Sequence, residues 1–204
     1  MAVVDLLLPS RCAGCGALGP SPCRGCAARL RAAPALPPPA GLDGLSALLR
    51  YDDAARVLVT AVKYRNARAS LAVLAPAAAA LVPELPDGTT VTWAPTTPER
   101  VRRRGFDQAE LLARTVARRL GLPVRALLER RPGPHQTGRP AAERRHHGPV
   151  VRARLPVTSS VLLVDDVCTT GTTLSACAVA LREGGAEAVH GLVLARTPAA
   201  RPPR

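Results

Sequence analysis

Residues 161–174 read VLLVDDVCTTGTTL, and this stretch decides the fold class. Four apolar residues in succession indicate a short strand buried on both faces, as in a parallel sheet. Two adjacent carboxylates, Asp165 and Asp166, end the apolar run, and a Thr/Gly loop then opens the next helix. The stretch therefore predicts a strand, a loop and a helix start that meet at one edge of a sheet.

The loop after the two aspartates has the composition of an anion site. Backbone N–H groups at a helix start point outward, and the helix dipole favours an anion there. Gly171 lets the backbone approach a ligand closely, and the threonines add hydroxyl donors, although any of them could instead cap the helix. We expect Cys168 to be a neutral filler within this loop. The predicted phosphate loop consists of Cys168, Thr169, Thr170, Gly171, Thr172 and Thr173.

The paired carboxylates are what a purely structural interpretation leaves unexplained. A capped helix after a turn would account for the glycine and the threonines, but not for Asp165 and Asp166. Carboxylates at a strand end suit the vicinal hydroxyls of a ribose, either directly or through Mg²⁺. The stretch thus offers one site for a sugar and a second for its phosphate.

The flanking sequence predicts an α/β class. Residues 172–185 have a helical pattern that turns Leu174, Cys177, Ala178 and Leu181 inward, and residues 188–197 form a further strand. A strand, a helix and a strand of these lengths form a βαβ unit, which requires a parallel sheet. Upstream, we expect helices over 54–64, 71–82 and 107–121, and a strand over 89–95.

Two details of the upstream helices can be checked against the structure. The first helix should bury Val57, Leu58, Ala61 and Val62, and Pro76 should lie near a helix start or a kink. The helix over 107–121 should bury Ala109, Leu112, Val116 and Leu120, and Gly121 should cap its end.

Arginines form a run between the predicted strand over 89–95 and the helix over 107–121. Arg100, Arg102, Arg103 and Arg104 would lie at the carboxyl edge of the sheet, where ligands bind in open α/β folds. Arginine can hold phosphate oxygens with two parallel hydrogen bonds. Two alternatives remain open: a solvated charge run, or a single-stranded nucleic-acid patch that includes Trp93 and Phe106.

Residues 131–149 are polar, basic and interrupted by glycine and proline, which predicts a loop or a long hairpin. Gln136 and Arg144 lie within it and are candidates for diphosphate contacts. Histidines 135, 146 and 147 are interpreted as exposed loop residues, because no carboxylates or strict ligand spacing accompany them.

Four cysteines near the N-terminus predict a metal site. Cys12 and Cys15 form one C-x2-C pair, and Cys23 and Cys26 form a second. Four thiolates in two symmetric knuckles can surround one tetrahedral ion, and this spacing favours structural zinc over an iron–sulfur cluster. A redox pair or unrelated buried cysteines are the alternatives. We expect residues 1–40 to form this module with a Pro-rich linker, 41–196 the main domain, and 197–204 a disordered tail.

Composition limits the classes of function. The chain has 204 residues and a formal net charge of +13, which favours polyanionic partners unless the surplus reflects only genome-driven arginine use. No apolar run is long enough for a membrane span, and the N-terminus lacks the pattern of a signal peptide. We therefore expect a soluble, cytoplasmic protein without membrane insertion.

The 161–174 stretch resembles the binding motif for 5-phosphoribosyl-1-diphosphate (PRPP) in type I phosphoribosyltransferases. The paired cysteines, VKY (62–64), APTTPERVRRRGFDQAELLA (94–113), HQTGRPAAERR (135–145) and the phosphate motif also occur in the order seen in ComF-like proteins. That family joins a zinc-binding N-terminus to a phosphoribosyltransferase-type domain, and it is associated with DNA uptake in naturally transformable bacteria.

The resemblance implies a set of roles. Asp165, Asp166 and Arg104 would carry catalysis with Mg²⁺, and Lys63, Arg100, Arg102 and Arg103 would contact the diphosphate or the hood that covers the acceptor. Two positions depart from the family pattern: Asp107 replaces the usual Asn of R-G-F-N-Q, and His146–His147 replaces a segment that usually carries Asn. An ionised Asp107 cannot donate a hydrogen bond, so any contact that needs that donor is affected.

Three functions follow from these expectations. The first is a PRPP-dependent phosphoribosyltransferase with an unknown acceptor, for which no general base stands out in the sequence. The second is a non-catalytic PRPP-binding module that works with single-stranded DNA or with a partner in the uptake machinery. A weaker third is a zinc-ribbon nucleic-acid protein whose second domain is only a scaffold.

Overall fold

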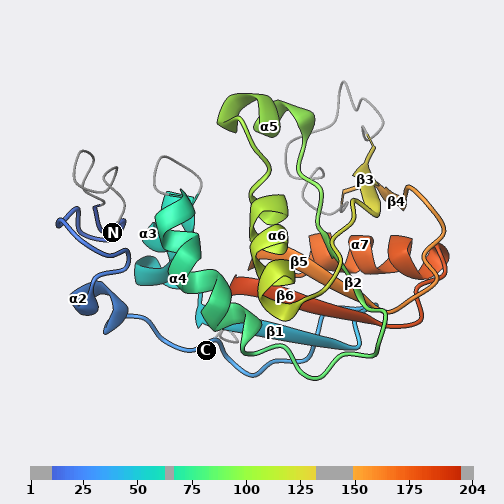
Figure 1. The fold of residues 1–204 in the computed structure, drawn as a ribbon, viewed down its shortest axis with the longest axis horizontal. Coiled ribbons are helices and arrows are strands. Elements are labelled where there is room, and N and C mark those ends of the chain that lie inside the picture. The colour runs from blue at the N-terminus through green and yellow to red at the C-terminus, as the bar shows by residue number, and fades with distance from the viewer. Residues whose placement is uncertain (1–10, 63–66, 132–148, 199–204) are drawn as a thin grey trace, which may run out of the picture.

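A four-stranded parallel sheet forms the centre of the computed structural model, which describes residues 11–62, 67–131 and 149–198 (Figure 1). The strand order is β1-β6-β5-β2, and every neighbouring pair is parallel. All four carboxyl ends therefore meet at one edge, which is where open α/β folds bind ligands. The strands are β1 (Gly44–Arg50), β2 (Thr90–Trp93), β5 (Val161–Cys168) and β6 (Val189–Arg196). This confirms the predicted α/β class.

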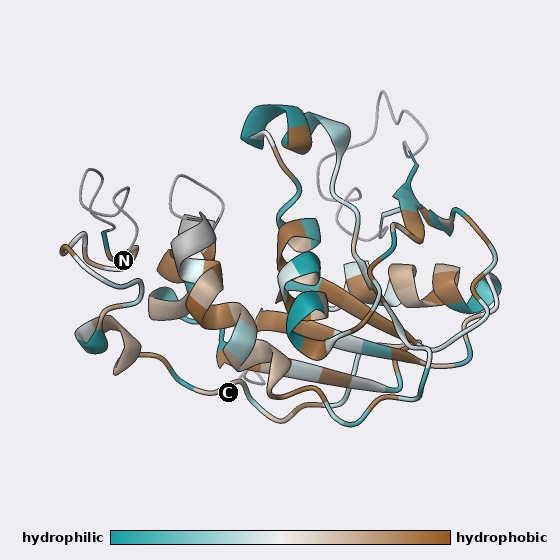
Figure 2. Ribbon diagram, viewed as in Figure 1, coloured by the Kyte–Doolittle hydropathy of each residue, from teal (hydrophilic) through white to brown (hydrophobic). Residues whose placement is uncertain are grey.

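Helices cover both faces of the sheet. The helices α3 (Asp53–Val62), α4 (Ala67–Ala79) and α6 (Gln108–Leu120) pack on one face, and α7 (Thr172–Glu183) packs on the other. The antiparallel pair β3 (Leu128–Arg130) and β4 (Val151–Ala153) lies beside α7, while α5 (Pro98–Arg104) projects from the body (Figure 1). The α5 ribbon is mostly hydrophilic, whereas β5 and β6 are mostly hydrophobic (Figure 2).

Strand β5 shows why the apolar run is continuous. Leu162 and Val164 pack into the cluster under α4 and α6, while Val161 and Leu163 pack into the opposite cluster under α7. Successive side chains of a strand point to opposite faces, so a strand buried on both faces needs an apolar residue at every position. The predicted βαβ unit of β5, α7 and β6 is confirmed.

The helical faces agree with the sequence patterns in most places. Leu174, Cys177, Ala178 and Leu181 of α7 are all buried. On α6, Ala109, Leu112 and Val116 are buried as predicted, and Gly121 closes the helix with a left-handed φ of 71°.

One predicted detail is wrong, and one of the two alternatives for Pro76 is excluded. Val57 is 46% exposed, because the buried stripe of α3 runs through Ala55, Leu58 and Val59 instead. Pro76 lies inside α4, which excludes a helix start at this position, whereas the alternative of a kink stays a prediction. The proline leaves the carbonyl of Ala72 without its helical donor, and Ala72 is exposed, so water can replace that donor.

Residues 131–149 connect β3 to β4, and the antiparallel pairing of these two strands agrees with the predicted hairpin. Arg130 of β3 is opposite Val151 of β4 in an antiparallel register. Residues 132–148 themselves lie outside the described part of the chain.

The N-terminal segment with the four cysteines, which includes α2 (Arg24–Ala27), makes specific contacts with β1 and α4. Ala32 forms an antiparallel bridge with Leu49 at the free edge of β1. The hydroxyls of Ser21 and Ser70 share a hydrogen bond of 3.0 Å, and both residues are buried. Among the described residues, no helix is both long enough and apolar enough to cross a membrane.

Candidate active site

Asp165 and Asp166 lie near the carboxyl end of β5, at the edge of the sheet that the sequence predicts. The backbone N–H of Asp166 donates to the Asp165 carboxylate at 2.8 Å. Burial raises the pKa of Asp165 well above its usual value, and the negative charge of Asp166 raises it further. Two adjacent carboxyl groups in this setting bind a proton, a cation or sugar hydroxyls more favourably than they carry two free charges.

The loop between β5 and α7 leaves the start of the helix open. Gly171 is the N-cap residue, with a φ of +80° and no side-chain capping hydrogen bond. The hydroxyls of Thr170 and Thr172 lie 2.8 Å apart, and both residues are exposed. Thr169 is also exposed. The Thr172 N–H donates to Oγ1 of Thr170 at 3.4 Å, which is a long hydrogen bond. A positively polarised helix end with exposed hydroxyls beside it is suited to an anion.

Cys168 and Thr173 mark the two sides of this loop. Cys168 is 3% exposed and belongs to the core cluster under α7, so its side chain faces the protein interior. Thr173 lines a cavity that also contains the two aspartates. The loop therefore exposes Thr169, Thr170 and Thr172, while Gly171 is buried and Cys168 anchors the loop in the core.

That cavity, named here the Asp–Arg cavity, has a volume of about 170 Å³. It brings acidic and basic groups together from four separate parts of the chain. The residues that give it this character are Arg100, Arg104, Asp107, Gln108, Arg130, Asp165, Asp166 and Thr173.

The four predicted arginines of the 100–104 run separate into different environments. Arg100 and Arg104 line the Asp–Arg cavity, and their spacing of four residues places them on one face of α5. Arg102 lines a second cavity on the other side of α5. Arg103 is exposed and lines neither of these two cavities.

Arg130 is a site residue that the sequence interpretation missed. It lies on β3 and lines the Asp–Arg cavity. Burial lowers its pKa, and the positive charge of Arg100 lowers it further. Three guanidinium groups that line one small cavity repel each other unless an anion lies between them.

Gln108 was also missed. It is 4% exposed, and its Oε1 accepts a hydrogen bond of 2.9 Å from Nη1 of Arg104. Nε of Arg104 and Nε2 of Gln108 are buried donors with no partner among the described residues. A buried donor without an acceptor is unfavourable, so both atoms need acceptor oxygens from a ligand or water.

Asp107 shows how the departure from the usual asparagine is accommodated. Its carboxylate accepts hydrogen bonds from the backbone N–H groups of Thr96 at 3.2 Å, Ala109 at 3.0 Å and Glu110 at 3.4 Å. It thereby caps α6 and ties the loop after β2 to that helix. Burial raises its pKa. In all three contacts Asp107 acts only as an acceptor, so none of them needs an amide donor.

The second cavity, named here the aromatic cavity, has a volume of about 820 Å³. It is lined by Trp93 and Phe106, the only tryptophan and the only phenylalanine of the chain. The Arg114 guanidinium lies 5.9 Å from the centre of the Trp93 ring. The two cavities share four wall residues, namely Pro95, Thr96, Asp107 and Arg130.

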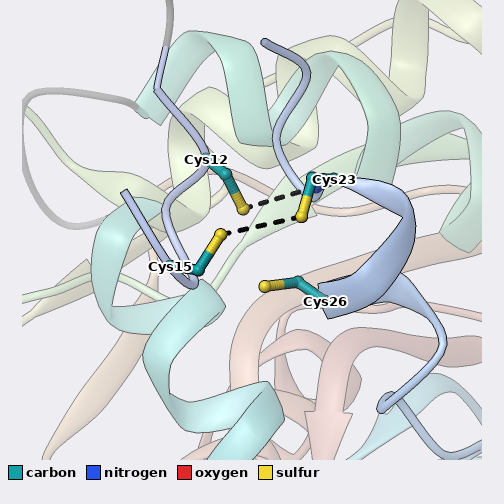
Figure 3. Close-up of side chains that lie close together, drawn as sticks. All are labelled: Cys12, Cys15, Cys23 and Cys26. Carbon is teal, nitrogen blue, oxygen red and sulfur yellow. Dashed lines mark hydrogen bonds between the residues drawn. The ribbon is translucent and has the colours of Figure 1, made fainter. Parts of the chain in front are cut away.

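The four N-terminal cysteines point toward one another (Figure 3). Their sulfur atoms all lie within 4.8 Å of each other, and none forms a disulfide. The Cys15 and Cys23 sulfurs are 3.7 Å apart. Tetrahedral zinc with bonds of about 2.3 Å needs sulfur separations of roughly 3.8 Å, so the cluster fits one ion such as zinc.

Backbone hydrogen bonds prepare this cluster for thiolates. The N–H of Cys23 donates to the Cys12 sulfur at 3.3 Å, and this is the main reason that the pKa of Cys12 is lowered to about 6. Hydrogen bonding to Cys12 and Cys15 raises the pKa of Cys26 to about 12. Four neighbouring sulfurs therefore cannot all ionise readily without a cation, which is the behaviour expected of a metal site.

Three predicted site residues lie outside the described part of the chain. These are Lys63, in a segment between α3 and α4, and Gln136 and Arg144, in the segment between β3 and β4. Their proposed roles at the diphosphate or the hood stay predictions.

Comparison with known proteins gives a partial match. A family model described as a phosphoribosyl transferase domain matches residues 107–204. No curated protein matches the sequence.

Two solved structures align with about three-fifths of the chain. One, described as the allosteric regulatory enzyme of purine biosynthesis, is 22% identical, with a TM-score of 0.41 over 59% of this chain. The other, glutamine PRPP amidotransferase from B. subtilis complexed with ADP and GMP, is 23% identical, with a TM-score of 0.40 over 58% of this chain. The alignments cover 24% of each of those chains.

The fold and the family model agree on one class. The family-model match spans β5, the predicted phosphate loop, α7 and β6, together with Asp107 and Gln108 of the Asp–Arg cavity. The parallel sheet flanked by helices is a type I phosphoribosyltransferase-like fold.

Proposed function

We propose that this protein binds PRPP and is a phosphoribosyltransferase-like protein of the ComF type, with an acceptor that is still to be identified. The observation that carries the proposal is the Asp–Arg cavity. Two carboxylates suited to ribose hydroxyls and three arginines suited to a diphosphate line the same small space, beside an open helix start. PRPP carries the three matching groups, namely ribose hydroxyls, a diphosphate and a 5′-phosphate, in one molecule.

Each part of PRPP has a matching part of the site. The 5′-phosphate suits the backbone and hydroxyls of the loop from Thr169 to Thr173. The ribose hydroxyls suit Asp165 and Asp166. The diphosphate suits the guanidinium groups that line the cavity, and its oxygens would supply acceptors for the buried donors of Arg104 and Gln108.

A transferase reaction at this site would break the bond between the anomeric carbon and the diphosphate and form a bond from that carbon to the acceptor. Arg100, Arg104 and Arg130 would stabilise the negative charge that develops on the departing diphosphate. Mg²⁺ bound together with PRPP would neutralise part of the same charge. The contribution of the protein is therefore positioning and charge stabilisation rather than covalent catalysis.

The ComF assignment rests on the order of motifs. A four-cysteine cluster that fits zinc precedes the phosphoribosyltransferase-like domain, and the module is attached to it through Ser21 and the bridge of Ala32 to Leu49. We assign to this cluster one structural zinc ion held by Cys12, Cys15, Cys23 and Cys26. The resemblance also supports a link to DNA uptake.

The enzymatic proposal is tested by pyrophosphate release from PRPP with a panel of candidate acceptors. The test variant combines Asp165→Asn with Asp166→Asn, and we expect it to abolish release. The chain provides a matched control in a second adjacent pair, Asp52 and Asp53, at the start of α3. Asp52→Asn with Asp53→Asn makes the same charge change and should leave release intact; equal loss in both pairs would contradict the proposal.

The aromatic cavity favours a second candidate function, a PRPP-binding module that holds single-stranded DNA without turnover. Trp93 and Phe106 could stack on bases, and Arg102, Arg114 and Arg154 line the same cavity and could contact phosphates. This candidate predicts PRPP binding without pyrophosphate release.

Trp93 makes this second candidate directly measurable, because it is the only tryptophan. Stacking of a base on the indole should quench its fluorescence on titration with a short single-stranded DNA, and rising salt should weaken the effect. Phe106→Leu should reduce the affinity with the charge unchanged. An unchanged Trp93 signal at saturating DNA would exclude this cavity as the DNA site.

A further inference from the structure

The Pro-rich segment from residue 36 to residue 42, named here the strap, lies against the predicted phosphate loop. A Cβ atom added to Gly171 would lie only 2.7 Å from Cγ of Pro39. Further along, a Cβ atom on Gly41 would lie 3.1 Å from Cβ of Ala178 on α7. Leu42 then enters the core cluster that also contains Leu174. The strap therefore follows the loop and α7 in close contact, rather than linking two separate parts loosely.

A proline-rich strap has a shortage of hydrogen-bond donors. Three successive prolines, 37 to 39, have carbonyl groups but no N–H. Their carbonyls must find donors elsewhere if they are removed from water. Arginine is suited to this task because its planar guanidinium presents five N–H donors and accepts none.

Arg196 supplies these donors. Its Nη1 donates to the Leu36 carbonyl at 2.8 Å, and its Nη2 donates to the Pro37 carbonyl. Arg196 is the last residue of β6, is 8% exposed, and forms none of the ion pairs found among the described residues. Arg196 also interacts with the side chain of Cys168. A buried cation without an ion pair is costly to maintain unless its donors are satisfied, and the strap carbonyls satisfy two of them.

Arg196 also lies at the base of the loop. It is the register partner of Cys168, the last residue of β5. The next residue, Thr197, donates its backbone N–H to the Cys168 carbonyl at 2.9 Å. One short stretch therefore holds the start of the loop through Cys168 and, through the strap, the end of the loop at Gly171.

We propose that Arg196 is a positioning residue for the 5′-phosphate subsite: by holding the strap against Gly171, it keeps the loop backbone in the form that receives the phosphate. This inference rests on the proposed PRPP function and extends it to a residue and a segment outside the phosphate motif. It predicts that changes in the strap weaken binding of the 5′-phosphate end of PRPP and leave binding of the diphosphate end unchanged.

Fragments of PRPP separate the two ends. Ribose 5-phosphate reports on the phosphate loop and the aspartates, whereas magnesium pyrophosphate reports on the arginine side of the cavity. Arg196→Lys keeps the charge but loses the planar fork that reaches two carbonyls. We expect it to weaken ribose 5-phosphate binding about tenfold in calorimetry, as expected when a pre-organised site becomes looser. Pyrophosphate affinity should change less than about twofold.

The control is Arg50→Lys, because Arg50 is the register partner of Arg196 on β1 and is exposed. Pro39→Gly is the second test variant; it removes the ring that touches Gly171 while leaving Arg196 in place, and it carries the test if Arg196→Lys does not fold. It should show the same selective loss of ribose 5-phosphate binding, measured below its thermal midpoint, which glycine lowers by adding freedom to the unfolded chain.

Three results overturn this inference: both fragments weaken equally, neither weakens, or Arg50→Lys has the same effect. The proposed function fails separately if the unmodified protein binds neither PRPP nor its fragments.

Discussion

Arg104 and Gln108 are joined by a hydrogen bond of 2.9 Å across the junction of α5 and α6. Each also has a buried donor, Nε of Arg104 and Nε2 of Gln108, without a partner among the described residues. Both residues line the cavity that holds Asp165 and Asp166. The pair thus fixes the direction of one guanidinium and leaves two donors for a ligand.

Arg104→Lys should weaken PRPP binding about tenfold or more, although the charge is kept. Lysine carries its three donors on one nitrogen and cannot reproduce the planar fork, so it cannot hold two phosphate oxygens in parallel while it bonds Gln108. Calorimetric titration with PRPP and Mg²⁺ measures the change.

The control for Arg104→Lys is Arg103→Lys, which is on the same helix but lines neither cavity. It should leave PRPP affinity unchanged. If the two variants behave alike, the arginines act as a diffuse charge and Arg104 has no specific position.

Gln108→Glu should remove the hydrogen bond that the buried amide donor would give to a bound diphosphate, while the shape of the side chain is kept. The new carboxylate can still accept from Arg104, but it would repel a diphosphate in the same cavity. We expect pyrophosphate affinity to fall at least about tenfold, since a hydrogen bond to a charged group contributes roughly 1.5–3 kcal/mol.

A variant two residues further along α6 gives the comparison for Gln108→Glu. Glu110→Gln changes a charge on the same helix at a residue that pairs with Arg114. It should leave pyrophosphate affinity nearly unchanged. Retained pyrophosphate binding in Gln108→Glu would remove Gln108 from the diphosphate site.

Asp165→Asn should raise stability at neutral pH. The folded protein holds the pKa of Asp165 well above the usual value of 3.8, chiefly because of burial. As the pH rises from 3.8 through the raised pKa, the native state binds more protons than the unfolded state, so the free energy of unfolding falls. The fall is at most about 1.4 kcal/mol per pH unit for one group, and asparagine does not titrate.

Urea unfolding at a series of pH values tests this. The stability of the variant relative to the unmodified protein should grow with pH across that window and be smallest near pH 3.8. A parallel curve for Asp165→Asn would show that its carboxyl group is not perturbed.

Gly14→Ala should weaken zinc binding. A Cβ atom at Gly14 would lie 2.7 Å from the Cys26 sulfur, too close for the sulfur to keep its position. Disturbing the surroundings of metal ligands typically costs roughly 10-fold to 100-fold in metal affinity. Competition with a chromogenic chelator measures the affinity.

Gly25→Ala is the matched control, because a Cβ atom there meets nothing within 4 Å. It lies in α2, where alanine is a better helix former than glycine. Zinc affinity should therefore be kept or rise slightly. Equal zinc affinity in both alanine variants would argue against a metal held by all four sulfurs.

The parts of the fold that the sequence predicts are those with a local cause. Strand β5 is apolar at each of its first four positions because both of its faces are covered, and α7 carries a clear helical stripe. The cysteine cluster was predicted because two knuckles of fixed spacing already determine the ligand set. In contrast, β1 was missed: its burial is mostly intermediate, since it lies at the edge of the sheet, so no regular pattern marks it.

The parts that could not be predicted depend on how distant segments meet. Arg130 reaches the cavity only because of where β3 lies, and Gln108 is buried only because of how α5 meets α6. The 31–41 stretch was interpreted as a spacer, yet Pro39 contacts Gly171 across more than a hundred residues of sequence. The rarity of aromatic residues is a sequence feature that points to one of the cavities, since the only tryptophan and the only phenylalanine of the chain both line the aromatic cavity.

PRPP binding in the Asp–Arg cavity is the property on which the other predictions about this site depend. Its most direct test is a calorimetric titration of the zinc-loaded protein with PRPP in the presence of Mg²⁺, beside the Asp165→Asn, Asp166→Asn double variant. We predict saturable binding at one site per chain in the unmodified protein and loss of that binding in the double variant, with the Asp52→Asn, Asp53→Asn control unaffected. No binding by the unmodified protein, or equal binding by the double variant, would contradict the account.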